Sequence, residues 1–173
     1  MRDIAKEINL EAKPWWGYLE EDLRELVKES FLLLRLFSPE TSVQGKLKFH
    51  DYSFIVFPIA KAYEGFLKRM FVDLGFITQE DYYGSRFRIG KALNPSLEEK
   101  YRKESIYDRI IDYCGGKEVA DKLWVTWKDA RNVIFHWFPD EKRAINYEEA
   151  RLKIFEVIEA IDQAFVDCEV AKV

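Results

Sequence analysis

Apolar side chains recur at intervals of three and four residues in several long stretches of the chain, which is the spacing of an amphipathic helix. One stretch runs from Tyr18 to Phe37, and another from about Tyr52 to Leu74 with Pro58 inside it. A third follows Asn146, and its stripe is formed by Ile154, Ile158, Ile161 and Phe165. No segment alternates as a strand would. The pattern predicts an all-α protein.

Capping signals and helix breakers place the remaining helices. Ser96 with Glu99, and Ser105 with Asp108, have the spacing of a capping box, so short helices are expected near Leu97 and Ile106. A longer helix is expected from Lys117 to about Trp137, because Gly115 and Gly116 precede it and Pro139 follows it.

These elements predict one domain, residues 1–173, folded as an antiparallel bundle of four to five main helices. Short extra helices are expected in the 76–105 region. Residues 1–17 are expected to form an arm that packs back on the bundle, and residues 40–49 a loop.

Composition narrows the classes of function. The chain has 173 residues and 48% hydrophobic content, enough for one core, and its net charge of -4 argues against a general nucleic-acid binder. The two cysteines, Cys114 and Cys168, form no zinc-ligand pattern with two distant histidines, so they are expected to be reduced core thiols. No metal or cofactor is expected. Without a long apolar run or a signal-type N-terminus, the protein is expected to be cytoplasmic and to have no membrane partner.

Basic and aromatic residues alternate between Tyr82 and Lys91, where Arg86 and Arg88 flank Phe87. Such a segment is able to grip a single strand through phosphates and stacked bases, and these two arginines are candidate substrate contacts. A surface loop with one short helix explains the same residues.

The strongest candidate for chemistry is the stretch from Arg131 to His136, near the end of the helix that precedes Pro139. Residues five apart on an ideal helix are separated by about 140° around its axis, so regular geometry does not place this pair on one face. Loosening of the last turn, or a second copy of the chain, would bring the two side chains together.

An arginine and a histidine together suit metal-free cleavage of RNA. Histidine changes protonation near neutral pH and takes the proton of a ribose 2′-hydroxyl, while a guanidinium binds the phosphate and stabilises its developing charge. DNA lacks the hydroxyl and would not be cleaved. Asn132 lies beside the arginine, and Lys128, one turn earlier, is a candidate phosphate contact.

Glu64 is a further candidate, at the margin of the apolar face of the Tyr52–Leu74 helix. Its carboxylate either pairs with Lys61 or Lys68 at the helix edge or is partly shielded and seeks another cation. Lys68 is also a candidate substrate contact.

Arg131, Asn132 and His136 match the R-x4-6-H motif of the HEPN domains, which the chain resembles also in helix order. The resemblance implies a helical bundle that dimerises with its motifs facing each other. It also implies a metal-independent endoribonuclease, frequently the toxin of a toxin-antitoxin pair, with RNA as substrate and an antitoxin protein as partner.

A narrower resemblance is to the HEPN domains of RNase LS-type toxins, in which an acidic residue on an earlier helix joins the arginine and histidine. Tyr63-Glu64 is similar to that position, and this implies that Glu64 orients Arg131 or carries a proton. Many HEPN toxins have an adenylylated tyrosine two residues after the histidine, where this chain has Phe138.

Two other interpretations fit the same residues. One is a HEPN-like module that binds a nucleotide or RNA without cleaving it. The other is a protein-interaction module in which Arg131 pairs with an acid and His136 makes a buried structural hydrogen bond.

Overall fold

A computed structural model describes residues 9–39, 48–137, 139 and 143–172, and all the regular elements in these ranges are helices. The main helices are α2 (Glu21–Leu36), α3 (Ser53–Asp73), α6 (Ile106–Tyr113), α7 (Lys117–Trp127) and α8 (Tyr147–Asp167). The shorter elements are η1 (Leu10–Ala12), α4 (Gln79–Tyr83), α5 (Ile89–Ala92), η3 (Glu99–Glu104), η4 (Lys128–Asn132) and η5 (Val170–Lys172). The predicted all-α fold is confirmed.

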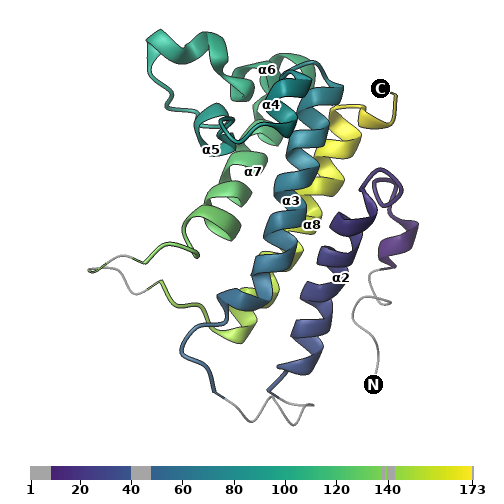
Figure 1. Ribbon diagram of the computed structural model, residues 1–173, viewed down its shortest axis with the longest axis vertical. Coiled ribbons are helices and arrows are strands. Elements are labelled where there is room, and N and C mark those ends of the chain that lie inside the picture. Colours follow the sequence, from purple (N-terminus) through teal and green to yellow (C-terminus); the bar gives the residue numbers. More distant parts are fainter. Residues whose placement is uncertain (1–8, 40–47, 138, 140–142, 173) are drawn as a thin grey trace.

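The long helices α2, α3 and α8 lie side by side, helices α4, α5 and α6 gather near the C-terminal end of α3, and α7 runs from there toward the middle of the bundle (Figure 1). Helix α2 runs opposite to α3, whereas α8 runs in the same direction as α3, so the expected antiparallel arrangement holds for α2 with α3 and is wrong for α3 with α8. Helix α7 packs on α8, so the segment that follows α7 emerges beside the middle of α3.

The predicted apolar stripes form the core. On α3 the stripe residues Ile59, Tyr63, Phe66, Leu67 and Met70 are buried, and on α8 so are Ile154, Ile158, Ile161 and Phe165. These side chains belong to one continuous apolar cluster, which holds α2, α3 and α8 together.

Pro58 lies inside α3 rather than at its start. The neighbouring N–H of Ile59 donates to Oγ of Ser30 on α2 at 2.9 Å, and Ser30 is fully buried. Proline disturbs the hydrogen bonding of a helix, and a buried N–H needs an acceptor. The serine therefore stabilises the proline-containing turn and fixes α2 against α3.

Most local signals are confirmed at the helix ends. Asn146 and Glu149 form the capping box of α8, and Oγ of Ser105 accepts from the N–H of Asp108 at the start of α6. The helix expected to begin at Leu97 is wrong by two residues, because η3 begins at Glu99 with no side-chain cap.

The predicted arm packs on the bundle as far as it is described. Trp15 is fully buried, and its Nε1 donates to Asp162 on α8 at 2.6 Å. Residues 1–8 of the arm and residues 40–47 of the predicted loop lie outside the described residues.

The expectation of reduced cysteines is wrong. Cys114, just after α6, and Cys168, just after α8, form a disulfide, with their Cα atoms 4.3 Å apart. Both residues are buried as expected, but their pairing depends on the packing of two helix ends that are 54 residues apart in sequence.

Across the described ranges, no helix combines the length and apolar character that crossing a bilayer requires.

Candidate functional site

The backbone around Arg131 changes from an α-helix to a π-helix. Helix α7 ends at Trp127, and Lys128–Asn132 form a π-helical turn in which the N–H of Val133 donates to the carbonyl of Lys128 at 2.8 Å. The prediction of one regular helix to about Trp137 is therefore wrong. A π turn holds more residues than an α turn, and such turns occur frequently at functional sites.

Arg131 contacts Glu64 across the interface between η4 and α3. Its Nη2 lies 3.2 Å from Oε2 of Glu64, and its guanidinium carbon lies 5.0 Å from the ring centre of Trp127. The other carboxylate oxygen of Glu64 lies 4.0 Å from Nζ of Lys68. The predicted pairing of Glu64 with Arg131 is thus present, and so is the alternative pairing with Lys68.

The pair is only half-buried, with 37% of the Arg131 side chain and 32% of the Glu64 side chain exposed. Ion pairs of this exposure contribute little to folding stability. A carboxylate on one side and an indole face on the other nevertheless restrict the guanidinium to one orientation, which leaves its remaining N–H groups available to a ligand.

Arg131 and Glu64 border a cleft of about 460 Å³, here called the Arg131 cleft. Arg88, Lys91 and Asn132 also line it, so three cationic side chains face one carboxylate. A hydrogen bond to Glu104 raises the pKa of Lys91 and also compensates its charge, so the positive excess comes from Arg88 and Arg131 facing Glu64. The cleft is therefore positive within an acidic protein and suits an anionic ligand such as phosphate.

Close packing fixes the wall of this cleft. A Cβ atom at Gly90 on α5 would lie 2.9 Å from Nε1 of Trp127, nearer than two such atoms normally approach. Glycine at this position lets α5 pack directly on Trp127, whose ring supports Arg131. The cationic segment around Arg88 is thereby held beside the guanidinium.

His136 does not line the Arg131 cleft. Its side chain is exposed in a separate cleft of about 700 Å³, here called the His136 cleft, together with His50 and Arg143. A ring contact of 5.4 Å between Phe57 and Phe135 joins the two walls of this cleft. The structure thus brings Arg131 together with Glu64 and Asn132, and it places His136 in the neighbouring cleft.

Sequence reasoning missed His50, although the chain has only two histidines and both line the His136 cleft. Two backbone contacts position the segment that carries it: the N–H of Tyr52 donates to Ile145 at 2.9 Å, and the N–H of Ile145 donates to Asp51 at 3.2 Å. No spacing in the sequence connects residues 50 and 145. The scarcity of histidine was the one signal available.

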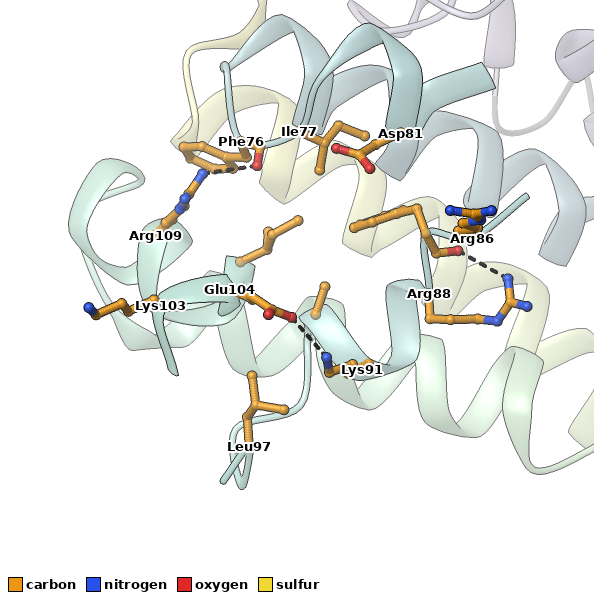
Figure 2. A pocket seen from close by; sticks show the side chains of 13 residues that line it. Phe76, Ile77, Asp81, Arg86, Arg88, Lys91, Leu97, Lys103, Glu104 and Arg109 are labelled. Carbon is orange, nitrogen blue, oxygen red and sulfur yellow. Dashed lines mark hydrogen bonds and ion pairs between the residues drawn. The ribbon is translucent and has the colours of Figure 1, made fainter. Parts of the chain in front are cut away.

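The remaining predicted contacts are divided among several places. Arg88 lines the Arg131 cleft, and it also lines a pocket of about 400 Å³ on the other side of its segment, together with Arg86 and Arg109. In Figure 2, Arg109 lies on one side of this pocket, and Arg86 and Arg88 lie on the opposite side. Lys128 is exposed on η4 and lines neither the Arg131 cleft nor this pocket.

Metal-binding side chains do not cluster in the described part of the chain, where no group of three or more His, Cys, Asp or Glu residues is placed to hold an ion. Comparison with family models, with curated proteins and with solved structures gave no match.

Proposed function

We propose that the protein is a metal-independent endoribonuclease of HEPN type, in which Arg131 binds the scissile phosphate and His136 transfers the proton. The observation that carries the proposal is the guanidinium of Arg131, held by Glu64 and Trp127 at a cleft bordered by Arg88. An oriented guanidinium beside other cations is the arrangement that a phosphate transition state requires.

The reaction needs no external nucleophile. His136 takes the proton of a ribose 2′-hydroxyl, whose oxygen attacks the adjacent phosphorus, and the bond from phosphorus to the 5′ oxygen breaks. The leaving oxygen takes up a proton from water, and His136 returns its proton to the solvent, so that the products are a 2′,3′-cyclic phosphate and a 5′-hydroxyl. Arg131 stabilises the charge on the phosphoryl oxygens, Asn132 donates a hydrogen bond, and Lys68 and Lys128 attract the strand.

A second copy of the chain would complete the site, because within one chain Arg131 and His136 line different clefts. Beside His136, Trp137 is 84% exposed and Phe57 is 50% exposed, and exposed aromatic side chains of this kind are favoured in protein interfaces. In the proposed homodimer the two motifs face each other, and His136 of one subunit approaches Arg131 of the other.

Mixing two inactive variants tests this arrangement. A heterodimer of Arg131→Ala and His136→Ala contains one site with both residues intact only if each site takes them from different subunits. We expect the mixture to recover cleavage that neither variant shows alone. A mixture that is as inactive as its components, although heterodimers form, would contradict the shared site.

The function itself is tested by cleavage of a single-stranded RNA in EDTA. We expect products with cyclic phosphate ends, no cleavage where the ribose at the scissile position is replaced by deoxyribose, and loss of cleavage in Arg131→Ala. A requirement for magnesium, or equal cleavage of DNA, would refute the proposal.

Binding of RNA or a nucleotide without cleavage is the second candidate. It is favoured by the separation of His136 from the cleft that holds Arg131. This candidate predicts that Arg131→Ala weakens RNA binding, while the wild-type protein yields no cleavage products at any concentration.

The biological setting implied by this proposal is a toxin that acts on cytoplasmic RNA and is neutralised by an antitoxin protein. Phe138, which lies outside the described residues, has no hydroxyl group, so adenylylation at that position is not the expected form of control.

A further inference from the structure

We infer that the pocket between Arg109 and Arg86, here called the Arg109 pocket, is a second RNA subsite that holds one nucleotide of the strand bound at Arg131. The inference rests on the proposed function for the position of the scissile phosphate. It adds a part of the binding surface that neither the motif nor the Arg131 cleft contains.

The Arg109 pocket is lined by more positive than negative side chains. Five cationic side chains line it, namely Arg86, Arg88, Lys91, Lys103 and Arg109, against the two carboxylates of Asp81 and Glu104. This local excess of positive charge occurs in a chain whose net charge is -4. A pocket of this kind attracts a polyanion by electrostatics.

The two carboxylates are already engaged. Asp81 accepts hydrogen bonds from Thr78 in the capping box of α4, and Glu104 pairs with Lys91 at 2.8 Å. Arg109 donates to the carbonyl of Phe76 at 2.9 Å, which leaves its charge uncompensated by that contact. Within the described ranges, no carboxylate pairs with Arg86.

The floor of the pocket is apolar. Ile77, Ala92 and Ile106 are buried beneath it, and Phe76 and Phe87 are partly buried in its walls. Single-stranded RNA is recognised by surfaces that combine cations for phosphate with aromatic and apolar faces for bases. At about 400 Å³, the pocket falls in the size range of small-ligand sites.

The Arg109 pocket adjoins the Arg131 cleft, and this position favours an RNA strand that occupies both over a small molecule bound in the pocket alone. Phe87, Arg88 and Lys91 line both cavities, so the segment that includes the start of α5 borders each of them. Gly90 in the same segment packs against Trp127, on which Arg131 stacks. A strand with a phosphate at Arg131 would cross Arg88 and place a neighbouring nucleotide in the Arg109 pocket.

Salt-dependent binding of a 2′-O-methyl RNA of about ten nucleotides tests the subsite, because this RNA cannot be cleaved by 2′-hydroxyl attack. Each phosphate contact on a single strand contributes about 0.7 to the slope of log affinity against log salt concentration. We expect the double variant Arg86→Ala with Arg109→Ala to lower that slope by about 1.4. Affinity at low salt should fall roughly tenfold or more.

The matched control removes two arginines from helices that line neither cavity. Arg24→Ala with Arg151→Ala makes the same change of charge on α2 and α8 and should keep the wild-type slope. A dinucleotide that occupies only the Arg131 cleft should bind all variants equally. Arg86→Ala alone is the control for unfolding, because Arg86 is exposed and forms no ion pair within the described residues, and it should lower the slope by about 0.7.

A double variant that is folded and keeps the wild-type slope and affinity would overturn the inference. Saturable binding of ADP that the double variant loses, with an unchanged slope for the RNA, would also overturn it and identify a small-molecule site instead. Because the probe is uncleavable, absence of ribonuclease activity would refute the proposed function without affecting the slope.

Discussion

Replacing Glu64 by glutamine should separate the contribution of its contact with Arg131 to folding stability from its contribution to the rate of RNA cleavage. The substitution keeps the shape of the side chain and removes the charge that holds the guanidinium at 3.2 Å. About a third of each side chain is exposed, so the pair should contribute only about 0.2–1 kcal/mol to the free energy of unfolding. Folding should therefore hardly change.

The effect on RNA cleavage should be much larger. A guanidinium displaced by about 1 Å from a productive position costs on the order of 100-fold in rate. Since orientation of Arg131 matters most in the transition state, kcat should fall with little change in KM. Glu64→Asp, which keeps the charge, should recover part of the lost rate.

Initial cleavage rates of a fluorogenic RNA and urea unfolding of the same samples measure both quantities. Glu159→Gln is the matched control, because it removes the same charge from an ion pair of 3.1 Å between Glu159 and Lys122 on the protein surface. Glu64→Gln with a wild-type kcat would refute the positioning role. A loss of several kcal/mol of stability would instead show that the pair is structural.

Three further predictions concern the fold. Ser30→Ala should leave a buried backbone N–H without its acceptor and lower the free energy of unfolding by about 1–3 kcal/mol, and an unchanged urea midpoint would contradict this. Burial raises the pKa of Tyr63 well above its usual value, so the stability that the neutral phenol contributes is complete below about pH 10 and is lost as the pH rises further. Thermal melts at alkaline pH should show a weaker pH dependence for Tyr63→Phe, and melts that change with pH as in the wild type would exclude this role. Replacing Cys114 and Cys168 by serine should cost roughly 2–4 kcal/mol, because their disulfide closes a loop of 54 residues, and wild-type stability insensitive to a reducing agent would refute this.

The helical architecture was predictable because its signals are local. Periodic apolar residues on α3 and α8 and the capping box at Asn146 act within a few turns of the chain, so they are visible without tertiary information. Ser30 was not predictable, since its task arises only where α2 meets the proline-containing turn of α3.

The candidate site was predictable only in part. The opposite charges of Glu64 and Arg131 permitted their pairing, and the structure shows the contact. Helical periodicity gave no sign of the π turn at Lys128–Asn132, because an apolar repeat assumes a regular α-helix, and the separate cleft of His136 was not foreseen either. His50 and the disulfide were missed because both depend on segments that meet only in the folded chain.

The most direct test of the central claim is cleavage of single-stranded RNA in EDTA by the wild-type protein and by His136→Ala, with both shown to be folded. The account predicts metal-independent cleavage by the wild type and a rate lower by about 100-fold to 10,000-fold in the variant, which is the usual contribution of a general acid–base group. A folded His136→Ala variant that cleaves RNA at the wild-type rate would contradict it.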